Sequence, residues 1–170
     1  MLLALSSSQS LAQINNDLEQ YRLGSGDFVK ITVFGQDDLM VETRLSNVGV
    51  INYPFLGDIN LVGLTLNEVE SLIDKGLRGD YLVNPSVSVT VLEYRPFFID
   101  GAVKKPGGYP YQPGLSISKA AALAGGFTER ANRGNVIIVR KLAGKETEIE
   151  ATEVDTILPG DIVTVNERFF

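Results

Sequence analysis

Short segments with alternating apolar and polar residues recur along the first part of the chain. Residues 28–34, 41–50 and 86–92 alternate in this way, and in the last of them valines alternate with serine and threonine. Residues 51–59 form a further extended segment, which Pro54 places at a sheet edge or a bulge. This period of two predicts β-strands, each with one buried and one exposed face.

One segment between these strands changes to helical spacing. Thr65 is followed three residues later by Glu68, which is the pattern of a capping box. The apolar stripe of this helix consists of Leu66, Val69 and Ile73. Lysine, arginine and glycine at 75–79 predict its end.

The second part of the chain shows a similar mixture of elements. The predicted elements are a strand at 97–99, a turn at 107–108, a short strand at 109–111, a helix at 117–124 capped by Ser116, and strands at 135–141, 145–150 and 162–165. Arg95 and Pro96 mark the joint, so we predict two domains at 21–95 and 96–170. Strands and helices mixed in this way predict an α+β fold class.

Two pairs of segments resemble each other within the chain. Residues 25–31 resemble 159–165, with a Gly-Asp pair before a strand, and residues 57–66 resemble 108–117, with Gly-Leu-Thr/Ser before a helix. The similarity suggests two small units of related construction, and chance similarity of turn chemistry is the alternative.

The charge of the chain excludes one class of partner. The formal net charge is −6, and it lies before residue 97, where six Lys and Arg stand against twelve Asp and Glu. No strongly basic block occurs, so no nucleic-acid partner is expected. With neither cysteine nor histidine, the chain lacks thiolate zinc sites, lipid attachment at cysteine and histidine-based catalysis.

The first residues resemble the end of a secretory signal. Ser10 and Ala12 are small residues at the spacing of a signal-peptidase site. We therefore expect residues 1–12 to be a signal-peptide remnant and 13–20 a leader; a polar N-terminal arm is the alternative.

Three motifs could be mistaken for sites of chemistry. Asp37 and Asp38 are adjacent and diverge in direction, so residues 36–39 are expected to form an exposed loop and not a carboxylate pair. Residues 24–26 lack the Gly-Lys-Ser/Thr ending of a phosphate loop and precede a strand. The acids of 145–155 alternate with other residues, as on a solvated strand. We predict no enzyme activity, no catalytic residue, no metal site and no cofactor.

One cluster suggests contact with a glycan. Sugars stack on aromatic rings, and an anionic polymer would also be attracted to lysine and arginine. The candidate glycan-contact residues are Arg95, Lys104, Lys105, Tyr109 and Tyr111. The alternatives are tyrosines that pack in the core or hairpin, and contacts between protomers.

The order of these motifs resembles the Wza-like outer-membrane polysaccharide export family. The resemblance to the polysaccharide export domain lies in residues 21–31, 51–59, 63–68 and 84–89. A soluble-ligand-binding β-grasp (SLBB) domain is resembled by residues 98–109, 123–128, 136–140 and 158–163. The resemblance implies a small mixed-sheet export domain followed by one β-grasp domain.

The resemblance also implies a function. It is that of a periplasmic, ring-forming homo-oligomer that carries a capsular polysaccharide or exopolysaccharide as cargo from an inner-membrane copolymerase to an outer-membrane channel. Larger members carry further β-grasp repeats, a lipidated cysteine and a pore-lining C-terminal helix. This chain is expected to associate with the outer membrane through a separate channel, for which a β-barrel is the candidate. A small soluble-ligand (glycan) binding module without a transport role is the alternative function.

Overall fold

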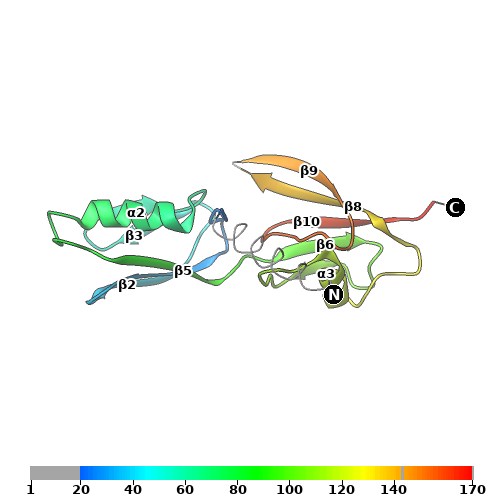
Figure 1. Ribbon diagram of the computed structural model, residues 1–170, viewed down its shortest axis with the longest axis horizontal. Helices are drawn as coiled ribbons and strands as arrows, with labels where there is room; N and C mark the ends of the chain where they lie inside the picture. The colour runs from blue at the N-terminus through cyan, green and yellow to red at the C-terminus, as the bar shows by residue number, and fades with distance from the viewer. Residues whose placement is uncertain (1–19, 143, 170) are drawn as a thin grey trace, which may run out of the picture. The chain divides into compact units, whose positions relative to one another are not determined.

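The computed structural model describes residues 20–142 and 144–169 (Figure 1). These residues form two compact units, an N-terminal unit that ends at Glu93 and a C-terminal unit that begins at Tyr94. The expected signal remnant at 1–12 and all of the leader except residue 20 lie outside the described residues.

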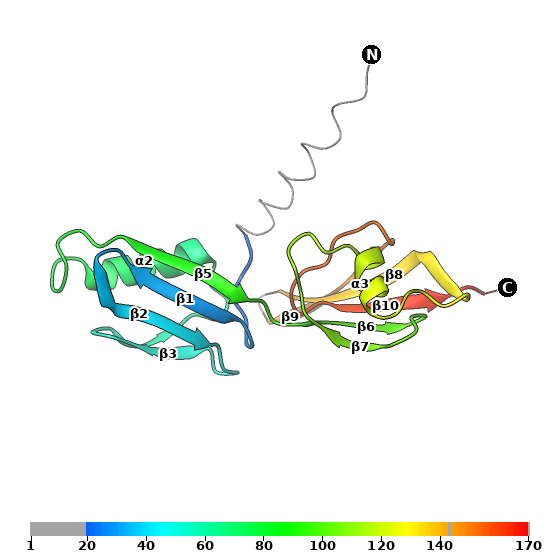
Figure 2. The same cartoon turned by 90° about the horizontal axis from the view of Figure 1, so that it is seen from below.

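The N-terminal unit combines two layers (Figures 1 and 2). Its three-stranded antiparallel sheet has the order β2 (Gln36–Arg44), β1 (Phe28–Val33), β5 (Val87–Glu93). The facing layer consists of the hairpin β3 (Val50–Tyr53)–β4 (Gly57–Asn60) and the helix α2 (Leu66–Leu77). As expected, Val69 and Ile73 of α2 are buried, but the stripe continues to Leu77, and Leu66 at the start of the helix is only partly buried. In β5, Val89 is buried while Ser88 and Thr90 are exposed, as predicted.

A buried tyrosine connects the two layers. The Tyr53 hydroxyl donates a hydrogen bond to the Leu39 carbonyl oxygen at 2.8 Å, and burial raises the pKa of Tyr53. Because both groups are shielded from water, this bond fixes β3 against β2.

Two expectations for this unit are wrong. Residues 36–39 do not form a loop, because a two-residue turn at Phe34 and Gly35 pairs Val33 with Gln36 and starts β2 there. Pro54 does not lie within a strand, because residues 54–56 form the turn between β3 and β4. The predicted strand at 41–50 accordingly covers the end of β2 and the start of β3.

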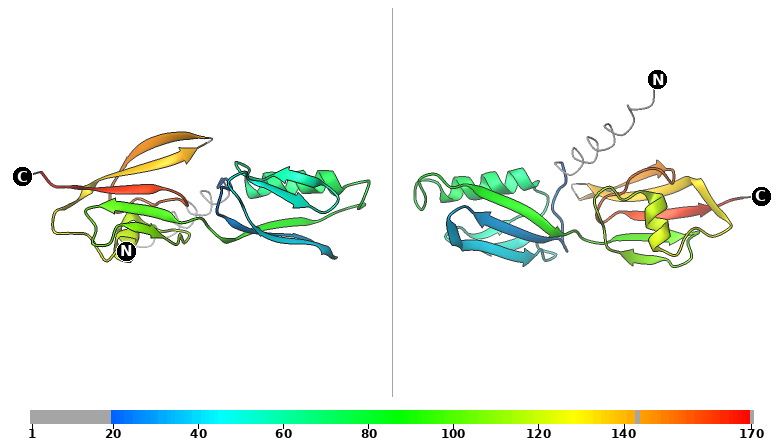
Figure 3. Two further views of the ribbon diagram at one scale, coloured as in Figure 1. Left: turned by 180° about the vertical axis from the view of Figure 1, so that it is seen from behind. Right: turned by 60° about the horizontal axis from the view of Figure 1, so that its bottom comes forward.

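Among its described residues, the C-terminal unit has one five-stranded sheet and one helix. The strand order is β7 (Gly107–Tyr109), β6 (Phe97–Gly101), β10 (Ile162–Glu167), β8 (Ala131–Leu142), β9 (Lys145–Ala151). β10 runs parallel to β6, and the other neighbours are antiparallel. The helix α3 (Ile117–Leu123) crosses one face of this sheet (Figure 3, right). This mixed sheet and helix, with those of the other unit, confirm the α+β fold class.

Small residues bring α3 close to the sheet. Ala120, Ala121 and Ala124 are fully buried and share one core with sheet residues such as Phe97 and Val163. Alanine leaves room for a helix to approach a sheet closely, and the exclusion of water from the apolar surfaces stabilises the contact.

The turn expected at 107–108 is wrong. Gly108 lies in β7 opposite Phe98, and a Cβ atom on it would lie 2.9 Å from the Phe98 ring. The glycine therefore allows the ring to cover the strand. The short strand ends at Tyr109, so Tyr111 lies beyond it.

Each of the two units contains a turn of the same construction. Asp27 and Asp161 each precede a strand, are almost completely buried, and accept the backbone N–H of the residue three positions earlier at 2.8 and 2.7 Å. The residue before each such turn also pairs with the segment that caps a helix. Leu23 N–H donates to the Leu64 carbonyl oxygen at 2.9 Å, and Ile157 N–H donates to that of Leu115 at 3.0 Å. The internal resemblance therefore reflects shared structure.

Candidate functional site

The candidate lysines lie in the loop between β6 and β7. Both side chains are exposed, while their backbone N–H groups are bound to the end of α3. Lys104 N–H donates to the Gly126 carbonyl oxygen at 3.0 Å and Lys105 N–H to that of Ala124 at 2.8 Å. Two side-chain cations are thus held on a fixed backbone beside the helix C-terminus.

The candidate tyrosines pack against the unit. The Tyr109 hydroxyl donates to the Lys105 carbonyl oxygen at 2.6 Å, and its half-buried ring lies 6.1 Å from that of Phe97. Tyr111 is 7% exposed and meets Tyr94 edge-to-face at 5.5 Å. A buried ring offers no open face to a sugar, so Tyr111 has a packing role.

Arg95 packs against the turn that precedes β10. Its half-buried side chain covers Gly160, where a Cβ atom would lie 2.5 Å from Nε. Because Tyr111 is buried, the five candidates do not all lie on an exposed surface. Contact with a glycan stays a prediction, and Lys104 and Lys105 are the members best exposed for it.

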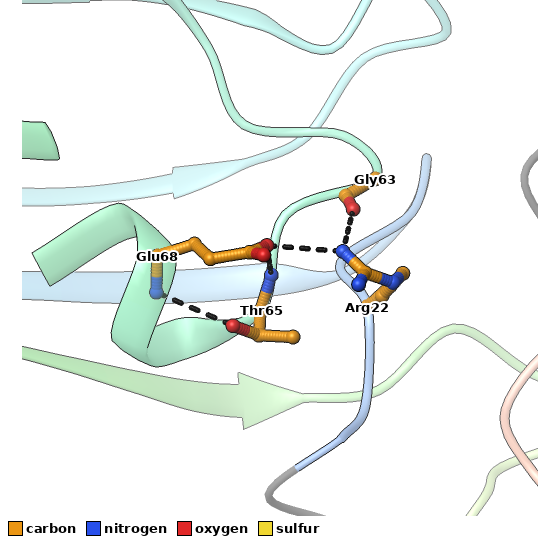
Figure 4. Close-up of polar contacts among 4 residues, drawn as sticks. All are labelled: Arg22, Gly63, Thr65 and Glu68. Carbon is orange, nitrogen blue, oxygen red and sulfur yellow. Dashed lines mark hydrogen bonds and ion pairs between the residues drawn. The ribbon is translucent and has the colours of Figure 1, made fainter. Parts of the chain in front are cut away.

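The N-terminal unit contains a polar network, of which the sequence predicted only the capping box (Figure 4). Thr65 N–H donates to Glu68 Oε2 at 2.8 Å, and Glu68 N–H donates to Thr65 Oγ1 at 3.2 Å. Arg22 Nη1 adds bonds to Glu68 Oε2 at 3.0 Å and to the Gly63 carbonyl oxygen at 2.8 Å. Arg22 was not predicted because it is far from α2 along the chain.

This network changes the acidity of one carboxyl. The Thr65 N–H bond, followed by the nearby Arg22 cation, holds the pKa of Glu68 below its usual value. The same side chain borders a shallow, open hollow along the outer side of α2, whose lining is Asn67, Glu68, Ser71, Leu72 and Lys75. The arrangement caps the N-terminus of α2. It does not suit an acid–base reaction, because the Glu68 carboxylate is held in hydrogen bonds to the Thr65 N–H and to Arg22.

The described residues include neither a metal-binding cluster nor a helix that could span a membrane. Within 20–142 and 144–169, no three His, Cys, Asp or Glu side chains are grouped so that they could hold a metal ion. In the same ranges, no helix has the length and apolar character needed to cross a bilayer.

Two family models match the chain in succession. Residues 15–92 match the model described as polysaccharide biosynthesis/export protein, and residues 96–150 match the SLBB domain. The first describes an export protein and not an enzyme.

Curated relatives point the same way. The exopolysaccharide production protein ExoF of Rhizobium meliloti (strain 1021) is 33% identical over 128 residues, which cover 68% of this chain and 30% of that protein. The EPS I polysaccharide export outer membrane protein EpsA of Ralstonia nicotianae is 27% identical over 184 aligned positions, 87% of this chain and 48% of that protein. EpsA of Ralstonia solanacearum is 30% identical over 112 residues, 51% of this chain and 29% of that protein.

The chain spans less than half the length of these relatives. Both matched models nevertheless follow each other in the order that the motifs predicted, and the sheets and helices of the two units are of the expected class. The chain belongs to the polysaccharide export family, with an export domain followed by an SLBB domain.

Proposed function

We propose that this chain is a periplasmic component of a polysaccharide export conduit and that several copies of it form a ring. It links an inner-membrane polysaccharide copolymerase to an outer-membrane channel, and a capsular polysaccharide or exopolysaccharide is its cargo. The observation that carries the proposal is the succession of the export and SLBB models along one chain, with relatives named for exopolysaccharide production and export. We also propose that the export domain extends over residues 21–95 and the SLBB domain over residues 96–170.

The role requires no chemistry from the chain. A conduit must hold a path open and let a polymer slide, so tight binding of the cargo would oppose transport. Exposed cations such as Lys104 and Lys105 suit weak, reversible contact with an anionic polymer, since exposed charge pairs contribute little free energy each.

Deletion of the gene in the source organism tests the role. We expect the secreted polymer to fall while its precursors are still made, and expression of the full chain in trans to restore secretion. Unchanged secretion in the deletion strain would contradict the proposal. The double variant Lys104→Ala, Lys105→Ala in the same strain tests the glycan contact, which unchanged secretion would remove.

A ring also predicts self-association. The absolute mass of the purified chain, measured by light scattering over a concentration series, should rise towards a discrete oligomer. The alternative function, a small glycan-binding module, predicts a strict monomer that binds an oligosaccharide saturably. Calorimetric titration with fragments of the organism's own polymer would detect that binding.

A further inference from the structure

The sheet of the C-terminal unit has one face that α3 does not cover. On this outer face, Phe98 of β6, Ile162 of β10 and Val139 of β8 lie side by side, as the strand register requires. Phe98 is 49% exposed and Ile162 is 41% exposed. The row is an apolar strip across three adjacent strands.

Acidic residues border this strip. Glu146, Glu148 and Glu150 are exposed at alternate positions of the edge strand β9, so their side chains share the outer face. Glu148 lies opposite Val139, which places a carboxylate at the end of the apolar row. Lys141, opposite Glu146, offsets part of this charge, and Asp100 of β6 adds to it.

The opposite side of the unit, which we call the helix face, carries the reverse charge. Lys119 and Leu123 are one turn apart on the exposed side of α3, and Leu123 is 51% exposed. Lys104 and Lys105 flank the end of this helix, because a Cβ atom on Gly125 would lie 3.3 Å from that of Lys104 and 3.6 Å from Cγ of Lys105.

These charged groups are available for a partner. Among the described residues, no ion pair is formed by Lys104, Lys105, Lys119, Glu146, Glu148 or Glu150. Each face therefore presents an exposed apolar spot beside charged side chains that form no ion pair among the described residues, and the two signs are opposite. The two faces lie on opposite sides of one sheet, with α3 on one side only (Figure 3, right).

We infer that the helix face of one copy of this chain docks on the outer face of the next copy. Two different, complementary surfaces on one protomer make a head-to-tail contact, and such contacts close into rings when the rotation between copies allows it. Leu123 would meet the Phe98–Ile162 strip, and the lysines would meet the glutamates of β9. The inference rests on the proposed ring and assigns its contact surfaces. It competes with the glycan-contact role of the lysine pair, and the mixing experiment below distinguishes the two.

Charge exchange tests the contact in the full chain. Lys104→Glu with Lys105→Glu makes both faces acidic, and Glu148→Lys with Glu150→Lys makes the outer face basic like the helix face. Each variant alone should associate at least about tenfold more weakly than the unaltered chain. An equimolar mixture of the two variants should recover the association. Sedimentation velocity measures the association of each variant alone and of the mixture. Lys75→Glu on α2 is the control, since it reverses a charge outside both faces.

The mixture separates the contact from a general charge effect. The Glu→Lys variant carries the smallest net charge of the set, so simple repulsion would make it associate best alone. Recovery of association only on mixing supports the inference. Association that is unchanged in every charge-reversal variant overturns it, although a ring formed through other surfaces would still be consistent with that result. A glycan-contact role for the lysines predicts no recovery on mixing.

Cross-linking keeps the test decisive if association is weak. The chain has no cysteine, so Lys104→Cys and Glu148→Cys each introduce one thiol. Oxidation at high concentration should form disulfide-linked dimers in a mixture of the two variants and none in either variant alone, because the thiol of each variant faces a residue without a thiol in its own neighbours. Equal linking of Lys104→Cys to itself, or no linking of the mixture, overturns the inference. Loss of polymer secretion in the deletion strain would still support the proposed function in either case.

Discussion

Asp27 and Asp161 hold equivalent places in the two units, yet different side chains complete their hydrogen bonding. The Tyr21 hydroxyl donates to Asp27 at 2.6 Å, whereas the Arg140 guanidinium donates two bonds to Asp161 at 2.9 and 2.7 Å. The Tyr21 hydroxyl is a neutral donor, whereas Arg140 and Asp161 form a part-buried ion pair.

The variant Asp161→Ala should strongly destabilise the C-terminal unit. It removes the ion-pair partner of Arg140 and the acceptor of the Leu158 N–H. Hydrogen bonds to charged groups contribute about 1.5–3 kcal/mol, and urea denaturation measures the loss. The control is Asp155→Ala, an exposed aspartate that accepts the Thr152 N–H at 2.7 Å and should cost about 1 kcal/mol. Equal losses would show that burial of Asp161 is unimportant.

The variant Tyr21→Phe should weaken the N-terminal unit more modestly. It keeps the buried ring and removes one donor to a carboxylate that is fully buried, at a cost of about 1–3 kcal/mol. Tyr81→Phe is the matched control, since Tyr81 is 48% exposed and its change should stay within about 0.5 kcal/mol. Thermal unfolding of both variants makes the comparison, and identical midpoints would contradict it.

Two glycines of the C-terminal unit should respond differently to alanine. Both have positive φ, 78° at Gly101 and 97° at Gly126, so each alanine carries backbone strain of about 1–2 kcal/mol. At Gly101 the new Cβ would also lie 2.2 Å from the Val165 carbonyl oxygen, while at Gly126 nothing lies within 4 Å. Gly101→Ala should therefore lower the unfolding free energy well beyond Gly126→Ala. A similar loss in both would mean that β6 and β10 separate easily.

The cap of α2 should make stability depend on pH. Because the folded pKa of Glu68 is lowered, its ionised form stabilises the fold above its unfolded pKa, and this contribution is lost as the pH falls through the lower folded value. Glu68→Gln should reduce stability at neutral pH and match the unaltered chain progressively below the ordinary value of 4.5. Urea midpoints across this range, with the exposed Glu129→Gln as control, test the prediction. A pH-independent difference would contradict it.

Elements with a strong local signal could be predicted from the sequence. The capped helices at Thr65 and Ser116 and the alternating β5 each depend on neighbouring residues, so their pattern is visible in one segment. The start of β2 could not be predicted in this way. Asp37 and Asp38 favour loops by residue type, and only their place on the sheet edge beyond a tight turn makes them strand residues.

The candidate site was harder to predict for a similar reason. Lys104, Lys105, Tyr109 and Tyr111 are close in sequence, and that proximity suggested one surface. The burial of Tyr111 depends on Tyr94 and on the core beneath it, which no local pattern reveals. The charged faces of the C-terminal unit likewise depend on strand register, because Val139 and Glu148 become neighbours only across β8 and β9.

The central position of β10 has a consequence for the order in which the two units can fold during synthesis. β10 lies between β6 and β8, although it follows every other described strand along the chain. During synthesis from the N-terminus, β6 and β8 therefore leave the ribosome with hydrogen-bonding edges that have no neighbour until the chain has been made as far as Glu167. The N-terminal unit, in contrast, has all its strands once Glu93 is delivered. Nascent chains stalled between these two points would carry a finished first domain and an aggregation-prone second one.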